Sequence, residues 1–142
     1  MTESKTITMR LPQSLRQQAE ARGEDLSSGL RDSLERYYAL LARARRGLEG
    51  RFTVGERGLL LDAWNGMFPP EAALLAENNV VLLEAQDIPA EAFRKWSASR
   101  EALLGELSTL TPLEQVALVD ALERWWRASK FGFAPRVEDL LK

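Results

Sequence analysis

Residues 5–12 (KTITMRLP) limit the folds open to this chain more than any other stretch. Polar and apolar side chains alternate from Thr6 to Leu11, which is the pattern of a β-strand with one buried face, and Pro12 ends the alternation. No second run of this quality follows in the sequence. Because a single strand is not stable in water, this segment needs a partner strand from elsewhere.

The segment after Pro12 has a helical pattern. Leu15 and Ala19 lie four residues apart within residues 13–22, which predicts a short helix with one apolar face. Gly23 follows at the position where glycine commonly ends a helix in a left-handed conformation. This helix has little apolar surface and would not be stable alone.

A second, longer helix is predicted from about residue 26 to about residue 46. Asp25 is a good N-cap for it. Steps of three, four and seven residues produce a continuous apolar stripe, formed by Leu26, Leu30, Leu34, Tyr37, Leu41 and Leu48. Gly47 and Gly50 then make the backbone more flexible, and we place a domain boundary there. The sequence therefore predicts two domains, residues 1–48 and 51–142.

The second domain is predicted to be all-helical. Expected helices cover residues 52–66, 69–86, 88–110 and 111–129, and residues 130–142 form a loop with one terminal helical turn. The middle of the second of these, NNVVLLEA, also fits a short strand. Two helices are expected to begin with capping boxes, Thr53 with Glu56 and Thr111 with Glu114.

Residues 53–64 align without gaps to residues 111–122, with Thr, Glu, Leu, Asp and Ala at matching positions. Capping boxes before amphipathic helices look alike in general, and this explains the similarity without common descent. A duplicated helical unit explains it too. Neither interpretation implies catalysis.

The chain contains no Cys and no His. Disulfides, Cys and His metal sites, Cys nucleophiles and Ser-His-Asp triads are therefore excluded. Only carboxylates, Lys, Tyr or Ser could carry out chemistry, so an enzyme is disfavoured. We expect no catalytic residue, no metal site and no cofactor.

Charge is distributed unevenly along the chain. Residues 1–51 hold ten Lys or Arg and seven Asp or Glu, a net charge of +3, whereas residues 52–142 have a net charge of −5. A basic first part and an acidic second part suggest different roles. No apolar run approaches the ~20 residues that span a bilayer, and residues 2–8 do not resemble a signal peptide. We expect a cytoplasmic protein.

Residues 5 to about 41 thus present one alternating strand, a short helix, a glycine turn and a longer amphipathic helix. This order resembles the ribbon-helix-helix family of DNA-binding proteins, the MetJ/Arc type, over about the first 45 residues. The segments that carry the resemblance are TITMRLP with Pro12, Leu15 and Ala19, GEDLSSGL at the turn, and Leu30 and Leu34. It implies a mostly α fold in which two chains pair their N-terminal strands as an antiparallel ribbon, with a C-terminal all-helical domain added.

The resemblance also implies roles for individual residues. The ribbon would enter the DNA major groove with base contacts from Thr6, Thr8 and Arg10. Phosphate contacts would come from Lys5 and from the start of the second helix at Leu26, Ser27 and Ser28. The core of the dimer would be formed by Ile7, Met9, Leu11, Leu15, Leu30 and Leu34.

The expected function is that of a homodimeric, sequence-specific DNA-binding protein, a transcriptional repressor or regulator, with double-stranded DNA as its partner. Residues 51–142 would oligomerise the protein further or bind a partner or effector. The alternatives are an antitoxin that represses its own operon and binds a toxin through the C-terminal part, a plasmid partition or relaxosome accessory protein, and a protein-interaction module that does not bind DNA.

Overall fold

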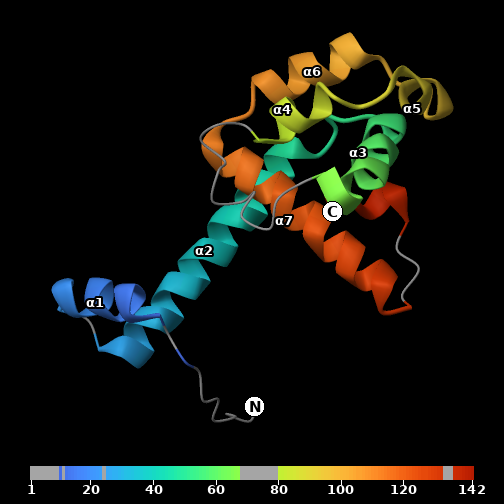
Figure 1. The fold of residues 1–142 in the computed structure, drawn as a ribbon. Coiled ribbons are helices and arrows are strands. Elements are labelled where there is room, and N and C mark those ends of the chain that lie inside the picture. The colour runs from blue at the N-terminus through green and yellow to red at the C-terminus, as the bar shows by residue number, and fades with distance from the viewer. Residues whose placement is uncertain (1–9, 11, 24, 68–79, 133–135) are drawn as a thin grey trace. The chain divides into compact units, whose positions relative to one another are not determined.

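Helices form all the regular structure in the part of the chain that the structure describes (Figure 1). The structure is a computed structural model that describes residues 10, 12–23, 25–67, 80–132 and 136–142. Within those residues there are seven α-helices, one 3-10 helix and no strand. By their internal contacts the residues divide into two compact units, Met1–Tyr38 and Ala39–Lys142.

The predicted fold class, with one strand per chain, is therefore wrong, and the resemblance to the ribbon-helix-helix family is not upheld, because the described chain is all-helical. Of the predicted strand only Arg10 is described, and it does not lie in a regular element. Residues 5–9 and 11 lie outside the described residues. Alternation shows only which side chains share a face. A strand also needs a hydrogen-bonded neighbour, and the described chain supplies none.

The N-terminal unit contains α1 (Gln13–Ala21) and the first part of α2 (Leu26–Leu48). Both predicted helices are confirmed, and so is the turn between them, where Gly23 has a positive φ of 66°. The carboxylate Oδ2 of Asp25 accepts a hydrogen bond from the backbone N–H of Ser28 at 3.2 Å, as expected of an N-cap.

The C-terminal unit consists of the last part of α2 and the elements that follow it. These are α3 (Val54–Met67), α4 (Val80–Ala85), α5 (Ala90–Lys95), α6 (Arg100–Ser108), α7 (Pro112–Lys130) and the 3-10 helix η2 (Val137–Asp139). In this unit α3 packs against α4, α7 and η2, while α4 packs against α6. The two helices with similar sequences, α3 and α7, are thus neighbours.

Both capping boxes are present. The backbone N–H of Thr53 donates to Glu56 Oε1 at 2.8 Å, and the N–H of Glu56 donates to Thr53 Oγ1 at 3.1 Å. At the start of α7 the reciprocal bonds between Thr111 and Glu114 measure 2.9 and 3.2 Å. In each box, two backbone N–H groups at the start of the helix, which have no partner within the helix, donate to side chains three residues away. Because these bonds are local, the sequence pattern predicted both helix starts correctly.

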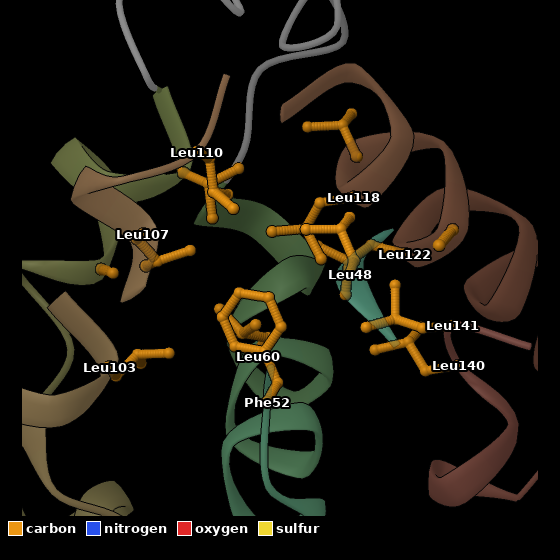
Figure 2. Packing of buried hydrophobic residues seen from close by; sticks show 14 of the residues in the cluster. Leu48, Phe52, Leu60, Leu103, Leu107, Leu110, Leu118, Leu122, Leu140 and Leu141 are labelled. Atoms are coloured by element: carbon orange, nitrogen blue, oxygen red, sulfur yellow. The ribbon is translucent and has the colours of Figure 1, made fainter. Parts of the chain in front are cut away.

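The core of the C-terminal unit is formed mainly by leucines of α2, α3, α6, α7 and the end of the chain (Figure 2). Helices α4 and α5 add Val81, Ala85 and Phe93. Leu48 of α2, Leu60 of α3 and Leu118 of α7 are fully buried. Leu140 and Leu141 enter the same core after η2. Burial of large aliphatic side chains at this density is the main term that stabilises the unit.

Residues 88–110 do not form the single helix that was predicted. The helix breaks between α5 and α6, where Ser97 has a positive φ of 52° and the hydroxyl of Ser99 accepts a hydrogen bond from the N–H of Ala102 at 3.3 Å. A new N-cap in mid-segment starts a new helix. For residues 69–86, the described part forms α4, so the strand alternative is wrong over residues 80–85, and residues 68–79 lie outside the described residues.

The two compact units divide earlier than the predicted boundary near residues 48–51. Leu41, Ala44 and Leu48 of α2 are buried in the core of the C-terminal unit. The last part of the apolar stripe of α2 therefore belongs to the C-terminal unit, where it is buried. The first part belongs to the N-terminal unit.

Candidate nucleic-acid and dimer interface

The described residues of the N-terminal unit form almost no core within one chain. Helix α1 contains no buried residue, and every residue of α2 from Arg31 to Tyr38 is exposed. Gly29 is the one residue of this unit that is buried among those the structure describes. A unit of this size buries too little apolar surface to offset its loss of conformational entropy.

Apolar side chains nevertheless lie on both helices of this unit. Leu15 on α1 is 50% exposed and Leu34 on α2 is 42% exposed, while Leu30 is half-buried. These are the three predicted dimer-core residues that the structure describes, and the other three, Ile7, Met9 and Leu11, lie outside the described residues. Exposed leucines at helical spacing mark a surface suited to association.

Two tyrosines extend this apolar surface along α2. The rings of Tyr37 and Tyr38 are 5.8 Å apart and tilted by 54°, and Tyr38 is 62% exposed. Leu40 is also exposed. Tyr38 and Leu40 fall outside the stripe of three- and four-residue steps, so the helical periodicity does not mark them. The available signal was the nearly unbroken apolar run YYALLA at residues 37–42.

The start of α2 already contains a negative charge. Ser27 and Ser28 are exposed in its first turn, which begins at Leu26, as the proposed phosphate contacts require. However, Asp25 engages this end of the helix with two groups: its carboxylate accepts from the N–H of Ser28, and its carbonyl oxygen accepts from the N–H of Gly29 at 2.8 Å. An incoming phosphate would therefore meet the Asp25 carboxylate as well as the favourable helix dipole.

Arginines are spread over the exposed surface of the N-terminal unit. The described ones are Arg10, Arg16, Arg22, Arg31 and Arg36, and all five are exposed. Acidic residues lie among them: Glu20, Asp25, Asp32 and Glu35. Among the predicted DNA contacts, Arg10, Leu26, Ser27 and Ser28 are described, whereas Lys5, Thr6 and Thr8 lie outside the described residues.

The described residues contain no group of three or more His, Cys, Asp or Glu side chains that could hold a metal ion. Within the same residues, no helix is both long and apolar enough to cross a membrane. No protein-family model, curated protein or solved structure matches the chain.

Proposed function

We propose that this protein is a DNA-binding regulator that acts as a homodimer through its N-terminal unit. One observation carries the proposal: the described helices of the N-terminal unit leave apolar side chains exposed together with exposed arginines. Leu15, Leu34 and Tyr38 are exposed on α1 and α2, and so are Arg16, Arg31 and Arg36. The unit as a whole holds six Lys or Arg and six Asp or Glu, so it has no net charge. A second chain would cover the apolar side chains, and folding of the unit would then depend on association.

Dimerisation would also repeat each arginine. Two copies supply each exposed arginine twice on a two-fold arrangement, which suits contacts to the phosphates of a duplex. Arg10, Ser27 and Ser28 are the described residues that we propose as DNA contacts. How the bases are recognised is left open, because the described residues contain no strand to enter a groove.

The test is fluorescence anisotropy of a labelled duplex taken from upstream of the protein's own gene, titrated at several salt concentrations. We expect affinity to fall with salt, since each neutralised phosphate contributes about −0.9 to the slope of log K against log[salt]. Arg10→Ala should weaken binding and reduce the slope. Arg94→Ala is the matched control, because Arg94 is an exposed arginine in the C-terminal unit. Equal binding by both variants and the parent would refute the assignment of Arg10.

A second candidate is a protein-binding module that does not bind DNA, and the tyrosine pair of α2 favours it. Tyr is enriched in the buried centres of protein interfaces, and Tyr37 and Tyr38 lie together on an exposed helix. The antitoxin alternative combines both properties. A chain that dimerises but has no salt-dependent affinity for any duplex would support the second candidate over the first.

A further inference from the structure

A cationic cavity lies within the acidic C-terminal unit. It has a volume of about 240 Å³ and is lined by Arg45, Ala121, Arg124, Trp125, Asp139, Leu140 and Lys142. The lining comes from the last turns of α2, the middle of α7 and the segment at η2. Three parts of the chain that are distant in sequence therefore meet around one hollow.

The charges around this cavity differ from those of the unit as a whole. The C-terminal unit, residues 39–142, holds 13 Lys or Arg and 15 Asp or Glu, a net charge of −2, yet the cavity lining holds three cations and one carboxylate. Lys142 pairs with Asp139 at 3.4 Å, which neutralises that carboxylate. Arg124 forms a looser pair with Asp120 at 3.6 Å. Positive charge gathered in an acidic unit favours an anion at this place.

Arg45 is the cation most available to a ligand. It is half-buried on α2, and no acidic partner is found for it among the described residues. A guanidinium can bind a carboxylate or phosphate through two parallel hydrogen bonds, and partial burial strengthens such bonds.

The other walls of the cavity are apolar and fixed in place. Ala121 and Leu140 are buried, and Trp125 is half-buried against the core. The indole Nε1 of Trp125 donates to the carbonyl oxygen of Arg136 at 3.3 Å, which holds the ring in one orientation. Convergent polar groups beside apolar walls are typical of small-molecule sites, and this volume suits a ligand smaller than most drug-sized compounds.

We propose that this cavity binds a small organic anion, one that combines a carboxylate or phosphate with a flat apolar body. The acid group lies between Arg45 and Arg124, and the apolar body lies against Trp125 and Leu140. This proposal does not depend on DNA binding. It concerns only the C-terminal unit.

The probe is 4-fluorobenzoate, whose binding to the full-length protein is followed by the broadening of its fluorine NMR signal. Arg45→Gln and Arg124→Gln should each weaken binding by about tenfold, which is typical for the loss of one charge-assisted contact. The matched controls are Arg46→Gln and Arg127→Gln, exposed arginines on the same two helices that do not line the cavity. Thermal unfolding of each variant verifies that it is folded.

Further ligands separate the possible sources of the anion. The neutral 4-fluorobenzyl alcohol should not bind, and inorganic phosphate should bind more weakly than the aryl carboxylate, because it cannot use the apolar walls. Equal binding of the alcohol, tighter binding of phosphate, or unchanged binding by Arg45→Gln would overturn the proposal. Displacement of the probe by a short DNA duplex would assign these cations to DNA, and would equally overturn it.

Discussion

The indole ring of Trp96 lies directly against Gly58 of α3. A β-carbon at position 58 would come within 2.6 Å of ring atom Cη2 and closer still to two other ring atoms. The ring cannot easily withdraw, because its Nε1 donates to Asp62 Oδ2 at 2.7 Å. The absence of a side chain at Gly58 thus allows the segment after α5 to pack on α3.

Replacing this glycine should destabilise the protein. We expect Gly58→Ala to lower the free energy of unfolding by about 1–3 kcal/mol, because the added methyl group overpacks a filled site. Gly105→Ala is the matched control, since a β-carbon there meets no atom within 4 Å in the interior of α6. The control should gain up to ~1 kcal/mol from helix propensity. Urea denaturation measures both, and equal effects would contradict the packing argument.

A second prediction concerns the pH dependence of stability at Glu114. Burial alone would raise the pKa of Glu114, but hydrogen bonds from Thr111 and the positive charge of Arg51 outweigh it and hold the pKa below its ordinary value of 4.5. Arg51 Nη1 donates to Glu114 Oε2 at 3.1 Å. A lowered pKa in the folded state means that the stabilisation is complete above pH 4.5 and is lost as the pH falls through the lowered value.

Glu114→Gln should therefore flatten the fall in stability below about pH 4.5. The free energy of unfolding, measured by denaturant titration at several pH values, tests this expectation. Glu101→Gln is the matched control, because Glu101 is an exposed carboxylate on α6. A slope that is as steep in Glu114→Gln as in the parent would show that this carboxyl does not contribute.

Self-association of the N-terminal unit gives a third prediction. Leu34→Lys places a charge on the exposed apolar surface of α2, and it should shift a dimer to monomers in sedimentation velocity experiments. Desolvating an unpaired ammonium in an interface is strongly unfavourable. Leu83→Lys is the matched control, because Leu83 is a comparably exposed leucine, 52% against 42%, on α4 of the C-terminal unit. The proposed interface would be wrong if Leu34→Lys sedimented like the parent.

Asp25 provides a fourth prediction, which tests whether the start of α2 approaches DNA. Asp25→Ser keeps a good N-cap but removes the negative charge beside Ser27 and Ser28. If phosphates bind there, DNA affinity should rise several-fold at low salt, because a repulsion of about 1 kcal/mol disappears, and the gain should shrink as salt is added. Asp32→Ser, on the same helix but outside its first turn, is the control. An unchanged affinity for Asp25→Ser would remove this helix end from the proposed DNA contacts.

Local signals in the sequence predicted much of the helical structure. Asp25 before α2, Thr53 before α3 and Thr111 before α7 each mark a helix start, because a cap depends on residues within one turn. Gly23 marked the end of α1 for the same reason. These features need no knowledge of the tertiary fold.

The errors occurred where distant residues decide the structure. The break near Ser97 was missed because Trp96 turns toward α3, where the small residue Gly58 leaves room and Asp62 accepts its hydrogen bond. The pattern of apolar residues within 88–110 cannot indicate a contact with a distant helix. The strand prediction was wrong for a related reason. Alternating polar and apolar side chains do not show whether a partner strand is available to form backbone hydrogen bonds. The cavity around Arg45 likewise joins segments that are far apart in sequence.

The burial of Leu140 and Leu141 has a consequence for the order in which the protein folds during its synthesis. These two leucines fill the core of the C-terminal unit, and Arg57 of α3 donates from Nη1 to the carbonyl oxygen of Glu138 at 2.8 Å, beside them. That core cannot close until residue 141 has left the ribosome. Helices α1 and α2 emerge first, with their apolar surface bare. A neighbouring nascent chain can therefore meet this surface before the C-terminal unit of either chain has folded.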